Sequence, residues 1–138
     1  MVKKKKIMTF QKAKKEAESD YVSSQSKSFN LLSTVLKLLS DPRVRREVGG
    51  FFGKITLFIE MVKEYFQGNY REIPVKTITS IIAALIYLAS PVDAIPDFIV
   101  VIGFVDDISV IAYVFRALNE DIESFKNWKE GKEGLESE

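Results

Sequence analysis

The sequence predicts an all-α protein, a small bundle of four to five helices around a hydrophobic helical hairpin. Three observations lead to this fold class. Apolar residues recur at helical spacing in several segments, no segment alternates with the period of a strand, and one long central segment is apolar on every side. With 138 residues, 46% of them hydrophobic, the chain is long enough to bury the core of one domain.

The first predicted amphipathic helix covers residues 28–40, where apolar side chains lie opposite polar ones. Its apolar residues are Phe29, Leu32, Val35, Leu36 and Leu39. We expect Asp41 and Pro42 to end this helix and to begin a short one, with Asp41 as N-cap and Pro42 at the first helical position. The basic residues that follow are Arg43, Arg45 and Arg46.

Two further helices are predicted before the middle of the hydrophobic region. Residues 51–67 combine one narrow polar stripe with a wide apolar face, and Gly68 with Asn69 is a typical helix end. Pro74 suits the start of the next helix, in which residues 78–89 have no polar face. That helix is therefore predicted to lie in a protein core or in lipid.

The last predicted helix begins near Asp106 or Asp107 and has a continuous apolar face. The residues of this face are Ile108, Ile111, Ala112, Phe115, Leu118, Ile122 and Phe125. From Arg116 onward the opposite face is polar. Residues 78–89 and 107–118 are thus the two arms of the predicted hairpin.

We expect one helical domain over residues 28–128, with its core at 77–118. Residues 1–27 are predicted to be a basic, partly disordered arm, because they are rich in lysine and lack the apolar stretch of a signal peptide. We place this arm on the cytoplasmic side. Residues 129–138 are predicted to be an acidic, frayed tail.

The composition excludes several kinds of function. The chain has no cysteine and no histidine, which removes disulfides, the usual zinc sites and Ser-His catalytic triads. The net charge of +1 gives no overall field that would attract nucleic acid. Because there is also no glycine-rich phosphate loop, the sequence does not indicate catalysis, although it leaves the question of an enzyme open.

Four carboxylates lie in the most hydrophobic part of the chain, at Asp93, Asp97, Asp106 and Asp107. One interpretation is local, since each can cap or precede a helix start. A second is a cluster at the end of the hairpin, where oxygen ligands would hold Mg²⁺, Mn²⁺ or Ca²⁺. A third is a structural network in which Asp93 or Asp97 pairs with the arginines at 43, 45 and 46. No other cofactor is predicted.

The stretch YLASPVDAIPDFIVVIGFVDDISVI resembles the core signature of the YkvA-like family of bacteria and archaea, also called the domain of unknown function 1232 family. The matching positions are Ser90, Pro91, Asp93, Ile95, Pro96, Asp97, Gly103, Phe104, Asp106 and Asp107. Val100 stands where members usually have proline. The resemblance implies an all-helical hydrophobic unit, often predicted to be a membrane protein, and it supplies no catalytic residues.

Membrane and soluble interpretations compete for the hydrophobic region. The longest uncharged run, from Thr77 to Val92, has 16 residues, whereas a transmembrane helix needs about 20. There is no base from Thr77 to Phe115, and the basic arm and arginines suit an anionic membrane surface. We therefore predict a membrane-associated protein with a scaffold or envelope-related role. The alternative is a soluble, cytoplasmic bundle that acts as a protein-interaction module.

Overall fold

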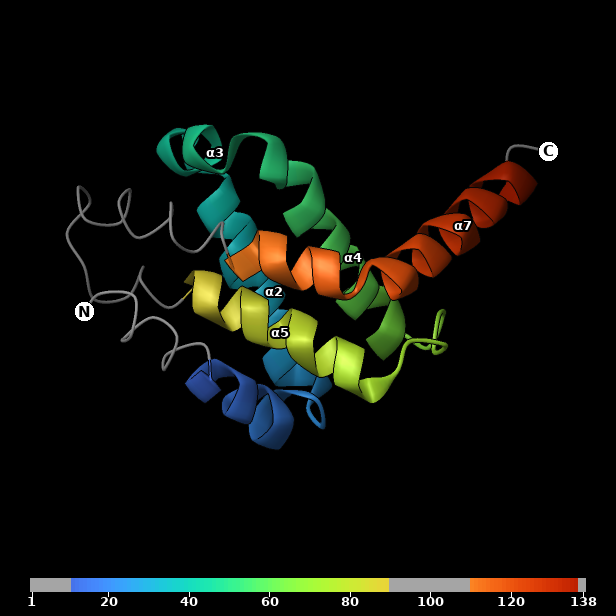
Figure 1. Ribbon diagram of the computed structural model, residues 1–138, viewed down its shortest axis with the longest axis horizontal. Coiled ribbons are helices and arrows are strands. Elements are labelled where there is room, and N and C mark those ends of the chain that lie inside the picture. Colours follow the sequence, from blue (N-terminus) through green and yellow to red (C-terminus); the bar gives the residue numbers. More distant parts are fainter. Residues whose placement is uncertain (1–10, 90–109, 137–138) are drawn as a thin grey trace.

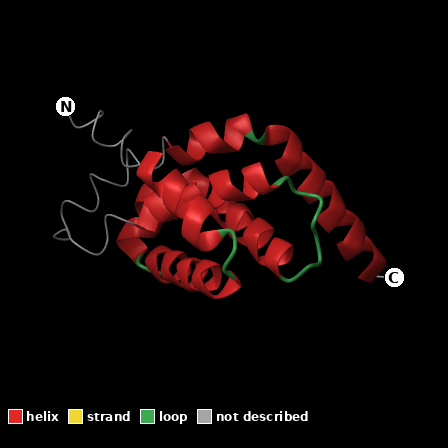
Figure 2. Ribbon diagram, turned by 90° about the horizontal axis from the view of Figure 1, so that it is seen from below, coloured by secondary structure: helices red, strands yellow, loops and turns green. Residues whose placement is uncertain are grey.

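The described part of the chain, residues 11–89 and 110–136 of a computed structural model, contains helices and connecting loops and no strand (Figure 2). The predicted all-α fold is therefore confirmed. The elements in order are η1 (Ala17–Tyr21), α2 (Gln25–Leu39), α3 (Pro42–Val48), η2 (Gly49–Phe51), α4 (Phe52–Phe66), α5 (Val75–Ala89) and α7 (Asn119–Glu136). Residues 11–16 and 110–117 are helical as well.

Helix α2 begins three residues before the predicted start at residue 28. Ser24 has extended backbone angles, and its side-chain oxygen accepts a hydrogen bond from the backbone N–H of Lys27. This is the arrangement of a serine N-cap, which satisfies one of the free N–H groups of the first turn. The buried Ser28 then bonds through its hydroxyl to the Tyr21 carbonyl at 2.8 Å, which ties α2 to the preceding helical turn.

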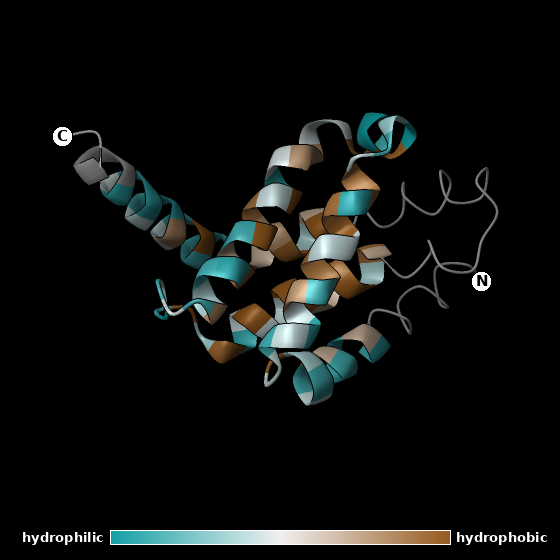
Figure 3. Cartoon of the chain, turned by 180° about the vertical axis from the view of Figure 1, so that it is seen from behind, coloured by the Kyte–Doolittle hydropathy of each residue, from teal (hydrophilic) through white to brown (hydrophobic). Residues whose placement is uncertain are grey.

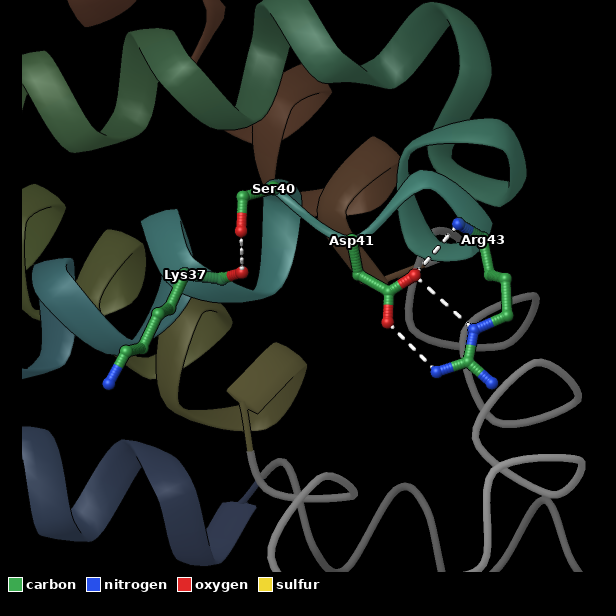
Figure 4. A network of polar contacts seen from close by, with 4 residues as sticks. All are labelled: Lys37, Ser40, Asp41 and Arg43. Carbon is green, nitrogen blue, oxygen red and sulfur yellow. Dashed lines mark hydrogen bonds and ion pairs between the residues drawn. The ribbon is translucent and has the colours of Figure 1, made fainter.

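Asp41 and Pro42 begin α3 in the predicted way. The Asp41 carboxylate accepts a hydrogen bond from the backbone N–H of Arg43 at 2.8 Å, and Pro42 is the first helical residue. The guanidinium of Arg43 folds back onto the same carboxylate, with Nη2 2.9 Å from Oδ2 (Figure 4). The side chain and backbone of Arg43 together hold the pKa of Asp41 below its ordinary value.

We expect acid to weaken this helix start. Because folding lowers the pKa of Asp41, its contribution to stability is present above the unfolded-state pKa and is lost as the pH falls through the folded-state pKa. Asp41→Asn keeps an N-cap side chain but removes the charge. Parent and variant should differ slightly in melting temperature at neutral pH, and the difference should shrink as the pH falls through the lowered pKa of Asp41. A difference that stays constant through the acid range would contradict the role of the charge.

Helix α4 has the predicted end. Gly68 has a positive φ of 80°, the left-handed conformation that glycine adopts without strain. Beyond it, the backbone N–H of Asn69 bonds to the Glu64 carbonyl at 3.0 Å, and the Asn69 side chain bonds to the Glu64 carboxylate. The backbone bond occupies one free carbonyl of the last turn, and both bonds help to direct the chain toward α5.

Helix α5 lies at the centre of the bundle. It contacts η1, α2 and α4, and from Thr77 to Ala89 every residue except Ser80 is buried. The absence of a polar face in residues 78–89 thus corresponds to burial against protein on all sides. In Figure 3 the hydrophobic residues, in brown, are concentrated in the ribbons at the centre of the bundle, and hydrophilic residues, in teal, are frequent in α3 and α7.

Residues 110–117 run beside α5 in the opposite direction, which is the hairpin arrangement expected for this region (Figure 1). Ile111 is fully buried in the same core as α5, and so is Val114, which the sequence analysis did not include in the apolar face. The start of the predicted arm, from residue 107 to 109, lies outside the described residues.

The predicted single helix is interrupted at Leu118, where a turn separates residues 110–117 from α7. Glu120 and Asp121 place acids in the first turn of α7, which favours a new N-terminus there. The apolar spacing nevertheless continues across the turn, since Ile122 and Phe125 are fully buried.

Both ends of the described chain are more helical than expected. Within the predicted basic arm, Ala13 and Ala17 are buried in the core, and η1 contacts α5. Helix α7 continues to Glu136 and leads away from the other helices (Figure 1). The packed part of the chain therefore begins well before residue 28.

Candidate functional site

The predicted carboxylate cluster falls in a part of the chain that the structure does not describe. Asp93, Asp97, Asp106 and Asp107 all lie in residues 90–109, outside the described residues. A bound Mg²⁺, Mn²⁺ or Ca²⁺ at these residues stays a prediction. Within residues 11–89 and 110–136, no group of three or more acidic side chains is arranged to hold a metal ion.

The three arginines suggested as partners of Asp93 or Asp97 differ in their surroundings. Arg43 pairs with Asp41, its neighbour in sequence. Arg45 stacks on an aromatic ring, with its guanidinium carbon 4.2 Å from the centroid of Phe52. Arg45 and Arg46 make no ion pair with any residue that the structure describes, so their charges are available for other partners.

A hydrogen bond joins the start of α5 to the first turn of α7. The hydroxyl of Thr77, at the start of α5, donates a hydrogen bond to the carboxylate of Asp121 in the first turn of α7, at 2.5 Å. Thr77 is buried and Asp121 half-buried. The bond connects residues 44 positions apart in sequence and fixes α7 relative to α5.

Replacing Thr77 with valine should therefore destabilise the bundle by about 1.5–3 kcal/mol, the usual value for a hydrogen bond to a charged group. Valine has nearly the shape of threonine but lacks the hydroxyl that donates this hydrogen bond. Thr79→Val is the matched control, because Thr79 is equally buried but bonds only to the Val75 carbonyl of its own helix. Urea unfolding of both variants, alone and combined with Asp121→Ala, checks the pairing. Additive effects of Thr77→Val and Asp121→Ala would contradict it.

Several cation–ring contacts connect α3, η2, α4, residues 110–117 and α7. Lys54 lies 5.4 Å from the centroid of Phe51 and 5.0 Å from that of Phe115, and Lys126 approaches Phe115 from α7 at 5.7 Å. With the stacked pair of Arg45 and Phe52 included, the members are Arg45, Phe52, Phe51, Lys54, Phe115 and Lys126. We call this set the basic–aromatic face. Figure 1 shows its first elements, α3 and the start of α4, together at one end of the bundle.

A second aromatic cluster anchors the base of α7. Tyr70 lies 5.4 Å from Phe125 and 5.0 Å from Trp128, measured between ring centroids. Burial raises the pKa of Tyr70, and the nearby acids Glu72 and Asp121 raise it further, so its phenol stays protonated at neutral pH. Because Lys129 also pairs with Glu60 of α4 at 2.6 Å, this cluster is a structural junction.

One cavity of about 520 Å³ opens beside the end of α5. Its lining consists of Glu16, Asp20, Tyr21, Lys27, Asn30, Leu31, Thr34, Ile86 and Ala89. The pKa of Tyr21 is raised, first by burial and then by the negative charges of Glu16 and Asp20. Since the lining mixes acids, a base and apolar groups, it selects no ligand class.

Comparison with known proteins identifies the family. Residues 77–113 match the family described as protein of unknown function (DUF1232). The chain is also 32% identical over 75 residues to the uncharacterized membrane protein YkvA of Bacillus subtilis (strain 168), an alignment that covers 54% of this chain and 71% of the relative. The chain belongs to the DUF1232 family.

No solved structure matches the chain significantly. Within the DUF1232 segment, the described structure covers α5 from Thr77 onward and residues 110–113. Among the described helices, none combines the length and the apolar character that crossing a bilayer requires.

The basic–aromatic face was not predicted from the sequence. The arginines at 43, 45 and 46 were expected to meet anionic lipid or to pair with Asp93 or Asp97. The rings of Phe51, Phe52 and Phe115 were expected to belong to apolar helix faces. The detectable signal was the run GGFFGK at residues 49–54, in which two aromatic residues are flanked by glycines and followed by a base. The contact of Lys54 with Phe115 joins residues far apart in sequence and required the structure.

Proposed function

We propose that this DUF1232 protein is a membrane-associated helical scaffold whose basic arm, residues 1–27, faces the cytoplasm. The observation that carries the proposal is the 32% identity to YkvA, a relative named as a membrane protein, along 71% of that relative. The excess of lysine in the arm agrees with a cytoplasmic location near anionic lipid.

The packing of α5 suggests how such a protein would meet the membrane. This helix is the most apolar element, yet it is enclosed by η1, α2 and α4, with only Ser80 half-exposed after residue 76. Lipid would reach α5 only if these neighbours separated. We therefore propose that the bundle associates with the membrane in its folded form, through its outer surface.

Cell fractionation tests this function. We expect the protein to sediment with membranes at physiological ionic strength and to be released in part by about 1 M salt, at which the Debye length is about 3 Å. Parallel extractions with alkaline carbonate and with detergent distinguish surface association from insertion. Complete recovery in the aqueous fraction at low ionic strength would overturn the proposal.

A soluble protein-interaction module is the second candidate, and one observation favours it. The later part of α7 leads away from the bundle (Figure 1), and its residues Glu130, Gly131 and Lys132 are exposed, so they are available to a partner. A monodisperse, detergent-free protein that remains aqueous in cells would support this candidate. A requirement for detergent to keep the protein monomeric would count against it.

A further inference from the structure

We propose that the basic–aromatic face docks on the anionic headgroups of a lipid bilayer. This inference rests on the proposed membrane association and names the surface that carries it. The face comprises Arg45, Phe52, Phe51, Lys54, Phe115 and Lys126.

Cations and aromatic rings lie beside one another on this face. Six cation–ring contacts are present among the described residues, and four of them belong to the face. Three of the four link Phe51, Lys54, Phe115 and Lys126, and the contact of Arg45 with Phe52 adjoins them because Phe52 follows Phe51. The rings of the face are only partly buried, so each presents apolar surface beside a positive charge. Helices that bind a membrane surface combine Lys or Arg with Trp, Phe or Leu, whose apolar groups enter the boundary between headgroups and acyl chains.

Two of the three cations of this face, Arg45 and Lys54, form no ion pair with any described residue, and neither does Arg46 beside Arg45. The third, Lys126, pairs with Glu123 of its own helix at 3.6 Å. Residues 41–54 contain four bases and two acids, and one of those acids, Asp41, pairs with Arg43. Two positive charges therefore remain in excess along this segment, where they would complement anionic headgroups.

Packing within the protein does not explain why residues 50 and 53 are glycines. A Cβ at Gly50 or Gly53 would meet no atom within 4 Å, and neither residue has a positive φ. Gly53 lies in the first turn of α4, where alanine would favour the helix more. Both glycines are exposed and flank Phe51 and Phe52. Small residues at these positions would let an external surface approach the backbone closely.

Vesicle co-sedimentation of the purified full chain tests the inference. The variant combines Arg45→Gln and Lys54→Gln, which lie in the face, with Arg46→Gln, the neighbouring base that makes no ion pair with a described residue. The control combines Lys27→Gln, Lys37→Gln and Lys63→Gln, which removes the same charge from exposed positions outside the face. Each basic residue near an anionic surface changes the affinity about fivefold, so the variant should lose about 100-fold and the control far less. Circular dichroism verifies that both remain folded.

Fluorescence provides a measurement independent of charge. The chain has one tryptophan, Trp128. Replacing Trp128 with phenylalanine and Phe51 with tryptophan therefore leaves a single tryptophan, which lies in the face. Vesicles with about one third phosphatidylserine and with lipids brominated near the headgroup should quench it. Phosphatidylcholine vesicles of the same bromine content should quench it much less, because the face carries positive charge.

The outcomes separate this inference from the proposed function. Equal loss of vesicle binding in variant and control would overturn the docking face. An unquenched tryptophan in the Phe51→Trp variant would overturn it as well. In either case, sedimentation of the protein with membranes in cells would still support the general function. If the protein neither sediments with membranes nor binds vesicles, both fall. Binding of a protein partner at this face, without vesicle binding, would also overturn the inference.

Discussion

Leu85→Asp should abolish folding of the isolated protein. Leu85 is fully buried in α5, at the centre of the helix that the rest of the bundle encloses. Removal of the leucine side chain costs about 2–5 kcal/mol, and burial of an unpaired carboxylate costs several more. Together these approach the whole stability of a typical domain, about 5–15 kcal/mol. Circular dichroism and gel filtration should report loss of helicity or aggregation.

Val75→Asp is the matched control, because it places the same residue in the same helix. Val75 is 56% exposed and is the first residue of α5, where a negative charge favours the helix dipole. Its stability should change by less than about 0.5 kcal/mol. If Leu85→Asp melted like Val75→Asp in detergent-free buffer, α5 would not be enclosed by protein.

Phe125→Ala is expected to lower the free energy of unfolding by about 3–5 kcal/mol. Phe125 is fully buried and joins the aromatic cluster at the base of α7, with centroids 5.4 Å from Tyr70 and 5.6 Å from Trp128. Alanine would leave a cavity that the surrounding rings and helices can fill only in part. Urea unfolding followed by the fluorescence of Trp128 measures the loss directly, because this is the only tryptophan.

Tyr113→Ala serves as the comparison for this substitution. Tyr113 is 69% exposed, so removal of its ring should change stability by less than about 0.5 kcal/mol. A loss below about 1 kcal/mol for Phe125→Ala would show that the site relaxes around the smaller residue and that the cluster does not anchor α7.

Much of the fold followed from local signals in the sequence. Asp41 with Pro42, and Gly68 with Asn69, mark helix ends through caps and backbone angles that depend on few neighbours. Burial of residues 78–89 followed from the absence of any polar face. The serines at residues 23–28 hid the start of α2, because Ser24 acts as an N-cap and Ser26 and Ser28 lie within the helix.

Other features depend on contacts that no local pattern encodes. The turn at Leu118 interrupts an apolar spacing that continues from Ile111 to Phe125, so periodicity alone predicted one helix. The basic–aromatic face joins α3, α4, residues 110–117 and α7, and its contacts appear only in three dimensions. The carboxylate cluster was predicted from the sequence alone and stays a prediction.

The central claim is that protein covers α5 when the chain is bound to a membrane. Because the chain has no cysteine, single cysteines can report on this. Ala84→Cys introduces a thiol at a fully buried position, and Val75→Cys introduces one at an exposed position of the same helix. Both variants would be treated on membranes with a lipid-soluble and with a water-soluble maleimide. We predict that the thiol of Ala84→Cys reacts with neither reagent until the protein is denatured, while the thiol of Val75→Cys reacts readily. Rapid labelling of the Ala84→Cys variant by the lipid-soluble reagent in the native protein would contradict the account.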